Sequence, residues 1–326
     1  MSEITFVSGG TGTPKLLDGA LASHRIDESE INVVVNTGDD IEIAGNLVCP
    51  DVDTVLYTLA DVIDRDRWWG TVDDTYETHE RLTDLADAEG KTERVEANRS
   101  ISEGRAFSGA GEFMLIGDRD RATHIHRTSL IDEGKTLTEA TSDLASSMGI
   151  EADVLPMSDD PVSTYIETPE GEVHFQVFWI AENGDPAVEN VEFRGVDGSE
   201  PTAETLEALE SPVVIGPSNP VTSLGPILSL DGVIEALRET RVVSVSPFVG
   251  GDVVSGPAPK LMRAEGLEAS TRGVYEAYSE FVDVVVVDET ESSLDLGCET
   301  VSANTVMESR EDSKRLFETV AEAVQL

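Results

Sequence analysis

The chain opens with the stretch ITFVSGGTGTPK, residues 4–15, in which an apolar run leads directly into a glycine-rich turn. A buried strand, a glycine turn and a following helix together place backbone N–H groups and a helix N-terminus against a phosphate. Gly9, Gly10 and Gly12 have no side chain, so the main chain can come close to an anion there. The stretch therefore predicts the first strand, the first helix and a candidate anion site between them.

The residues after the turn predict where the helix begins. Thr13 is a good N-cap, and Pro14 suits the first helical position because its missing N–H costs nothing there. Lys15 adds a positive charge in a chain with few of them. The turn matches neither the Walker pattern nor the dinucleotide pattern. A tight strand-to-helix turn without a ligand is therefore an open alternative at this point.

Short runs of β-branched residues recur along the chain, and most are continuous, which is typical of strands buried on both faces. Helical patterns alternate with them, and a capping box at 136–139 starts a helix that ends near Gly149. The alternation predicts an α/β fold with a doubly wound, mainly parallel sheet. Residues 174–180 and the turn at 182–185 favour an antiparallel insertion. The expected strands are 4–7, 31–35, 113–116, 213–215, 241–245 and 282–287, and further helices are expected at 54–63, 228–237 and 316–324.

The length of 326 residues allows one large domain or two ordinary ones, and we interpret residues 1–326 as a single large domain. Residues 89–111 are polar, contain Gly and Ser and lack periodicity, which predicts a mobile insertion or lid. No internal repeat is evident.

The composition is strongly acidic: 22 Lys and Arg stand against 65 Asp and Glu, a net charge of −43. Such a charge repels itself unless salt screens it, so we expect a protein adapted to a salt-rich cytoplasm. No basic stripe is available to neutralise phosphates, so nucleic acid is not an expected partner. Two cysteines in a chain of this length make no disulfide scaffold. No signal or membrane-spanning run is present, and no membrane partner is expected.

Polar clusters follow the predicted strands, where ligands bind in open α/β sheets. Asp51 and Asp53 lie at the start of the predicted helix and close in sequence to Asp39 and Asp40. Aspartates at a helix start usually cap it, but carboxylates brought together can also hold Mg²⁺ on a diphosphate or orient an attacking hydroxyl. The clusters are residues 36–40, 117–121, 157–164, 216–223 and 246–251.

His124 and His126 invite a zinc hypothesis, but no third ligand is obvious. On a strand, histidines two apart face the same way by geometry alone, so we favour a structural or substrate-contacting role. Trp68 and Trp69 are more typical of a core or pocket wall than of a cofactor site. The signatures of serine hydrolases, zinc proteases and kinases are absent.

Taken together, these motifs closely resemble the 2-phospho-L-lactate transferase family of coenzyme F420 biosynthesis. The resemblance runs from Ile4 to about Ser309, nearly the whole chain. It is carried by SGGTGTPK (8–15), VVVNTGDD (33–40), PDVDT (50–54), RWWG (67–70), GDRDRATH (117–124), PMSDDPVSTY (156–165), GPSNP (216–220), VSP (245–247), SGPA (255–258) and KLM (260–262).

The resemblance implies a Rossmann-like fold, a homodimer and a magnesium-dependent transfer. The donor it implies is lactyl-2-diphospho-5′-guanosine or its enolpyruvyl relative. The acceptor is the deazaflavin Fo (7,8-didemethyl-8-hydroxy-5-deazariboflavin), and the products are F420-0, or its dehydro form, and GMP. An in-line displacement at a diphosphate depends mainly on positioning and on neutralisation of charge.

The resemblance also assigns roles to residues of this sequence. Asp53 matches the family's Fo-contacting aspartate, and Asp40 with Asp53 are the candidates for Mg²⁺ or for the base. Trp69, Leu115 and His124 are further candidates for contact with Fo. Leu115 stands where the family commonly has a basic residue, so only a main-chain contact is expected there. The guanosine diphosphate half is assigned to Gly9, Gly10, Thr11, Gly12, Lys15, Asn36, Ser218 and Asn219.

Two rival functions are compatible with the same phosphate-binding turn. One is a nucleotide-dependent transferase with another three-carbon or acyl donor. The other is a nucleotide-binding regulatory protein without turnover. The acidic cluster of Asp40, Asp51 and Asp53 favours an enzyme, because a pure binder needs no metal and no base beside the diphosphate.

Overall fold

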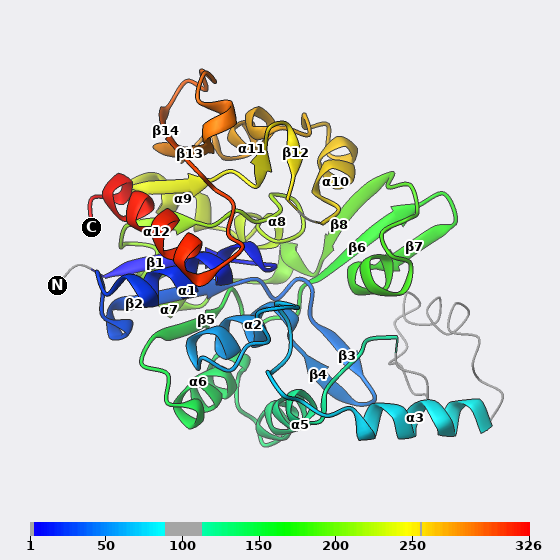
Figure 1. The fold of residues 1–326 in the computed structure, drawn as a ribbon. Coiled ribbons are helices and arrows are strands. Elements are labelled where there is room, and N and C mark those ends of the chain that lie inside the picture. The colour runs from blue at the N-terminus through cyan, green and yellow to red at the C-terminus, as the bar shows by residue number, and fades with distance from the viewer. Residues whose placement is uncertain (1–2, 89–112, 255) are drawn as a thin grey trace.

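A seven-stranded, all-parallel sheet forms the centre of the computed structural model, which describes residues 3–88, 113–254 and 256–326 (Figure 1). The strand order is β14-β13-β10-β9-β1-β2-β5. This is an α/β, Rossmann-like arrangement, as predicted. The strands are β1 (Ile4–Ser8), β2 (Ile31–Val35), β5 (Asp153–Pro156), β9 (Val213–Ile215), β10 (Val242–Val245), β13 (Val284–Asp288) and β14 (Glu299–Ala303).

Both faces of the sheet are buried, which explains the continuous apolar runs. Phe6 and Val33 point into one core, and their neighbours Val7 and Val34 point into the other. The first core is covered by α1, α2 and α12, and Figure 1 shows α1 and α12 on the same face. The helices are α1 (Gly12–Ser23), α2 (Pro50–Leu59), α3 (Glu77–Ala88), α5 (Asp118–Asp132), α6 (Leu137–Met148), α7 (Ala203–Ala208), α8 (Gly225–Leu228), α9 (Val233–Glu239), α10 (Ala258–Ala264), α11 (Thr271–Tyr278) and α12 (Arg310–Val324).

The sheet reverses its winding direction at β1. From β1 the order runs to β2 and β5 on one side and to β9, β10, β13 and β14 on the other. Open α/β sheets bind ligands in the crevice at such a switch point, outside the carboxyl ends of the strands. The glycine turn after β1 and the loop after β9 meet there, because a Cβ on Gly12 would overlap the carbonyl oxygen of Pro217.

Smaller elements surround the central sheet. An antiparallel insertion is present as predicted, but as a three-stranded sheet of β6 (Ser163–Thr168), β7 (Gly171–His174) and β8 (Asn190–Arg194), which Figure 1 shows to one side of the central sheet. Of the predicted residues 174–180, only His174 belongs to a strand. A π-helical turn, η2 (Val177–Ala181), follows β7. Two hairpins complete the strands: β3 (Ile41–Ile43) with β4 (Asn46–Val48), and β11 (Phe248–Val249) with β12 (Asp252–Val253).

Several local predictions are confirmed. The capping box of Thr136 and Glu139 starts α6, and the helix ends at Gly149 with a positive φ of 77°. The helix predicted at 54–63 is present as α2, which begins earlier, at Pro50, and ends at Leu59, so Asp51 and Asp53 lie in its first turn.

Other local predictions are wrong. Residues 113–116 form no strand, and they lead as a loop into α5. Helix α1 begins at Gly12, one residue before the predicted cap Thr13. The expected helix at 228–237 is two short helices, α8 and α9. The predicted insertion at 89–111 lies outside the described residues. Within the described residues, no helix combines the length and apolarity needed to span a membrane.

Candidate active site

A cavity of about 580 Å³ lies at the switch point of the sheet. Its walls come from the glycine turn after β1, the first turns of α2 and α5, the loop 67–70 and the loops after β9 and β10. Of the predicted site residues, Gly9, Gly10, Thr11, Gly12, Lys15, Asp53, Trp69, Leu115, His124, Ser218 and Asn219 line it. Asn36 and Asp40 do not line it. The structure thus brings most of the predicted site residues together, although they lie far apart in the sequence.

Close backbone packing fixes the glycine turn. A Cβ at Gly9 would overlap the carbonyl oxygen of Ser223, and Gly10 has a positive φ of 63°. Ser218 braces the turn, because its hydroxyl donates to the carbonyl of Gly9 at 2.7 Å and lies 2.9 Å from the hydroxyl of Thr13. The hydroxyl of Thr13 therefore stabilises the contact between the loops and does not cap the helix. The glycines serve this tight junction as well as a close approach to an anion.

Asp51 holds the same glycine turn through its carboxylate. Its carboxylate accepts hydrogen bonds from the N–H of Gly10 at 2.8 Å and from Nδ2 of Asn36 at 2.9 Å. Burial raises the pKa of Asp51 to about 6, although these two donors work against the shift. Asn36 is fully buried and also donates to the carbonyl of Thr222 at 3.3 Å. Asn36 thus acts behind the cavity wall by holding Asp51.

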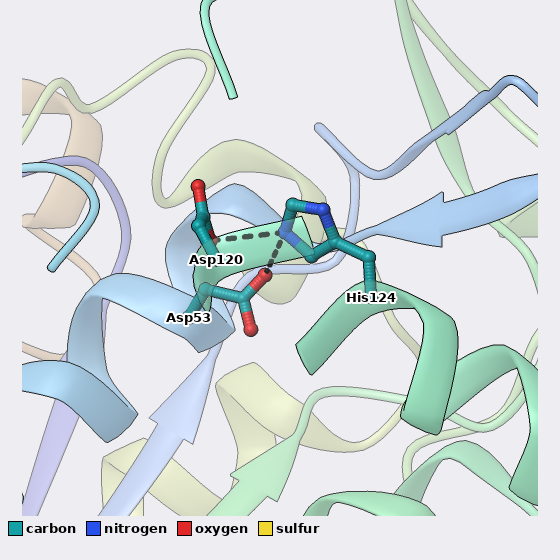
Figure 2. A group of neighbouring side chains, drawn as sticks. All are labelled: Asp53, Asp120 and His124. Atoms are coloured by element: carbon teal, nitrogen blue, oxygen red, sulfur yellow. Dashed lines mark ion pairs between the residues drawn. The ribbon is translucent and has the colours of Figure 1, made fainter. Parts of the chain in front are cut away.

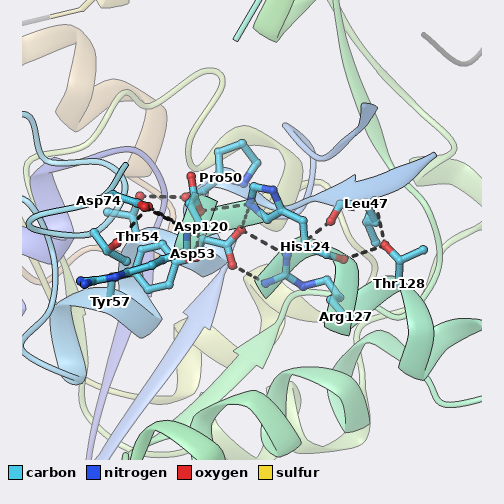
Figure 3. A network of polar contacts seen from close by, with 12 residues as sticks. Leu47, Pro50, Asp53, Thr54, Tyr57, Asp74, Asp120, His124, Arg127 and Thr128 are labelled. Atoms are coloured by element: carbon cyan, nitrogen blue, oxygen red, sulfur yellow. Dashed lines mark hydrogen bonds and ion pairs between the residues drawn. The ribbon is translucent and has the colours of Figure 1, made fainter. Parts of the chain in front are cut away.

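Asp53 lies at the centre of a buried ion-pair network, shown in Figures 2 and 3. Arg127, which is fully buried, contacts both carboxylate oxygens of Asp53. Nε2 of His124 lies 3.1 Å from Asp53 Oδ2 and 3.2 Å from Asp120 Oδ1. The hydroxyl of Tyr57 donates to Asp120 at 2.8 Å.

The network sets the charges in the site. Burial alone disfavours ionised Asp53, but Arg127 and His124 outweigh it and lower the pKa of Asp53 to about 2. Burial opposes protonation of His124 as well, yet Asp120 and Asp53 raise its pKa to about 9. At neutral pH the cavity therefore presents an ionised carboxylate at Asp53 beside a protonated imidazole.

Asp40 has a different environment from the one predicted. Burial raises its pKa well above the ordinary value, and the Cys49 thiol and Arg127 only partly offset this. Asp40 also does not line the cavity. Asp53, Asp120 and His124 instead form a buried group whose ligand atoms all lie within 4.8 Å of one another.

Three residues of the network had no site role in the sequence analysis, although Asp120 belongs to the polar cluster 117–121: they are Asp120, Arg127 and Tyr57. Asp120, His124 and Arg127 are spaced by four and then three residues, which places them on one face of a helix. The sequence analysis predicted a strand at 113–116 followed by a polar loop, and this prediction hid the helical spacing. The histidine pair does not face one way, since His124 is buried and His126 is exposed.

The site combines the features that a group transfer at a diphosphate needs. A glycine turn, a helix N-terminus and Lys15 offer donors and positive charge to phosphate oxygens. The ionised carboxylate of Asp53 lines the same cavity and can accept a hydrogen bond from a hydroxyl. Trp69 and Leu115 add an apolar wall for a ring system.

Comparisons with known proteins agree with this arrangement. The family model described as 2-phospho-L-lactate transferase CofD matches residues 4–324. Proteins with the name 2-phospho-L-lactate transferase are 52% identical in Haloarcula marismortui, over 98% of both chains, and 51% identical in Halobacterium salinarum, over 98% of this chain and 97% of that one. One from Methanosarcina mazei is 49% identical over 97% of this chain and 98% of its own.

A solved structure shows the same fold at low identity. A UPF0052 family protein from Bacillus halodurans has a TM-score of 0.62 at 19% identity, over 98% of this chain and 99% of that chain. This likeness concerns the fold alone. The family model and the close relatives decide the assignment: the chain belongs to the 2-phospho-L-lactate transferase family.

Proposed function

We propose that the chain moves the 2-phospholactyl group of lactyl-2-diphospho-5′-guanosine, or the enolpyruvyl phosphate of its relative, to the deazaflavin Fo. The products are F420-0, or its dehydro form, and GMP, in the biosynthesis of coenzyme F420. One observation carries the proposal: a single cavity of about 580 Å³ is lined both by the glycine turn with Lys15 and by the ionised Asp53.

The reaction forms one bond and breaks one. The terminal ribityl hydroxyl of Fo attacks the phosphorus that carries the lactyl group, and the bridging oxygen leaves with GMP. Asp53 is placed to accept the hydrogen bond of this hydroxyl, and then its proton, as the new O–P bond forms. With a pKa of about 2, Asp53 is a weak base, so its main contribution is to orient the hydroxyl.

The diphosphate is assigned to the turn Gly9–Gly12 and to Lys15. The turn supplies backbone N–H groups other than that of Gly10, which donates to Asp51, and the half-buried ammonium of Lys15 supplies charge. Ser218 and Asn219 line the adjoining wall, where we place the guanosine half. Asn36 contributes indirectly through Asp51. Fo is assigned to the opposite wall, with Trp69, Leu115 and His124 beside Asp53.

The resemblance implies Mg²⁺, and the two carboxylates of the buried group formed by Asp53, Asp120 and His124 suit this ion. Carboxylate oxygens are the ligands that Mg²⁺ prefers, and Asp53 and Asp120 each present one in the same buried group. We propose that these two residues hold Mg²⁺, and that Asp40 acts behind them. When bound, the ion neutralises charge on the diphosphate.

The rival function is a nucleotide-binding regulatory protein without turnover. The buried network around Asp53 favours the enzyme, because keeping a carboxylate ionised away from water is costly and serves no purpose in simple nucleotide binding. Phosphorus NMR of the protein with donor, Fo and Mg²⁺ separates the two. We expect the signal of GMP and that of a new phosphodiester. An unchanged donor spectrum would contradict the transferase. Paired runs with lactyl and enolpyruvyl donors identify the preferred donor.

We also propose that the protein acts as a homodimer in a salt-rich cytoplasm. The dimer follows from the family resemblance and the location from the composition. Light scattering after size-exclusion chromatography in molar KCl is expected to give twice the 35.0 kDa chain mass. A mass of one chain under those conditions would contradict the dimer.

A further inference from the structure

Lys15 differs from the other cations around the cavity. Arg67 and His124, which also line the cavity, pair with carboxylates, whereas Lys15 makes no ion pair with any described residue. Its ammonium lies 5.3 Å from the centre of the Trp68 ring, within the range of a cation–π contact. Burial lowers the pKa of Lys15 from its ordinary value.

The backbone of Trp68 is strained. Its φ is 59°, in the left-handed region that a bulky residue rarely adopts. The loop holds this conformation through its own hydrogen bonds: the N–H of Trp68 donates to the carbonyl of Asp64 at 2.7 Å, and the N–H of Asp64 donates to the carbonyl of Gly70 at 3.1 Å. Ile63 and Thr71 pair at the base of the loop.

A partly buried ion pair holds the loop against α1. Arg65, three residues before Trp68, contacts Asp18 at 2.9 Å. Asp18 is buried and lies on α1, about one turn after Lys15. Two successive contacts, Arg65 with Asp18 and Trp68 with Lys15, therefore hold the loop against the helix that starts at the glycine turn.

An indole face suits this position better than a carboxylate would. It attracts the ammonium without neutralising its charge and without using its N–H donors. An acidic partner would compete with phosphate oxygens for the same ammonium. We propose that Trp68 is a positioning residue that holds Lys15, still charged and free to donate, against the diphosphate of the donor.

This inference rests on the proposed function, and a binding experiment separates the two. Isothermal calorimetry measures the affinity for GDP of the wild type and of the Trp68→Leu, Trp68→Phe, Lys15→Met and Trp68→Leu/Lys15→Met variants. Loss of a cation–π contact predicts GDP binding weaker by about 3- to 30-fold in Trp68→Leu. Trp68→Phe keeps an aromatic face and stays within about 3-fold of the wild type.

Two controls exclude a merely structural role. Guanosine has no phosphate, so its affinity is expected to be equal in the wild type and in Trp68→Leu. In the Lys15→Met background, Trp68→Leu is expected to weaken GDP binding no further. Equal GDP affinity in the wild type and Trp68→Leu, or equal losses for GDP and guanosine, would overturn the inference and leave the proposed function intact. A wild type that binds no GDP would overturn both.

A measurement on the unsubstituted chain covers the case in which Trp68→Leu does not fold. The chain has only five lysines, so NMR spectra of lysine-labelled protein are simple. The ring current of Trp68 predicts an upfield shift for the ε-methylene protons of Lys15, assigned by their loss in Lys15→Met. GDP is expected to change this signal. Ordinary shifts for all five lysines would contradict the contact.

Discussion

At the scale of single residues, the site depends on how Arg127 and His124 keep Asp53 ionised. Asp53 was predicted from the sequence because a helix-start aspartate close to other aspartates is visible in the chain. His124 was predicted as well, but as a contact to Fo and not as a partner of Asp53. Arg127 was not predicted, because a buried arginine has no sequence signature until the helix that carries it is identified. The charge of a site residue is set by neighbours that are distant in sequence, and only the fold shows them.

The catalytic role of Asp53 is tested by Asp53→Asn. The amide keeps the shape but loses the charge that orients the hydroxyl and then accepts its proton, so turnover is expected to fall by about 10²- to 10⁴-fold. GDP affinity measured without Mg²⁺ is expected to stay within about 3-fold, because the phosphates are assigned to the glycine turn. GMP release gives the turnover and calorimetry the affinity. Near-normal turnover would remove Asp53 from the mechanism.

The charge of His124 predicts that the free energy of unfolding depends on pH. Its folded pKa of about 9 lies above the ordinary 6.5, so its stabilisation is complete below pH 6.5 and is lost as the pH rises through about 9. The free energy of unfolding is expected to fall by up to ~3 kcal/mol across this window. Urea unfolding without ligands measures it, with His124→Gln as the control expected to flatten the curve. Identical slopes in both proteins would contradict the assigned charge.

At the scale of elements, α5 shows where sequence reasoning failed and why. Its charged residues hide the helical pattern, because Asp120, His124 and Arg127 are buried and Leu130 is the one apolar residue of α5 that is buried with them. Apolar periodicity therefore cannot find it. The glycine turn, α2 and α6 were predictable because glycines, a proline start and a capping box are local signals.

The start of α5 is fixed by a carboxylate from another segment. Asp74 accepts hydrogen bonds from the N–H groups of Arg119 at 2.9 Å and Asp120 at 3.1 Å, while Asp118 accepts from those of Glu77 and Thr78 at 3.0 Å each. Each acid thus caps the start of the helix in the other segment. The backbone of the Gly-Asp-Arg-Asp motif is therefore held in place, and this fixes the position of Asp120.

Removal of one cap is expected to weaken the helix start. Asp74→Ala leaves two N–H groups of α5 without their acceptor and is expected to cost about 0.5–2 kcal/mol of unfolding free energy. Turnover is also expected to fall, because the backbone of Asp120 is no longer held. Asp132→Ala, an exposed substitution at the other end of α5, is the matched control, expected within about 0.5 kcal/mol of the wild type. Equal stability of the two variants would contradict the cap.

At the scale of the whole molecule, the alternation of strands and helices was enough to predict the parallel doubly wound sheet. Strand order, the pairing of β1 with both β2 and β9, and the cavity at that switch point were not predictable, since they depend on contacts distant in sequence. The net charge of −43 predicts a global property as well.

Stability is expected to rise with salt. The Debye length falls from about 10 Å at 0.1 M to about 3 Å at 1 M, so added KCl screens the repulsion between acidic side chains. Urea unfolding in KCl between these concentrations measures the change, and sucrose at matched osmolality is the uncharged control. A rise with KCl that exceeds the rise with sucrose is expected. Equal stability at low and molar KCl would reject salt adaptation.

The central claim is that one cavity holds the diphosphate at the glycine turn and the acceptor hydroxyl at Asp53. A crystal structure with GDP and Fo bound together tests it most directly. We expect the phosphates against Gly9–Gly12 and Lys15, and the terminal ribityl hydroxyl within hydrogen-bond distance of Asp53. Phosphates bound away from the turn, or a hydroxyl bound away from Asp53, would contradict it.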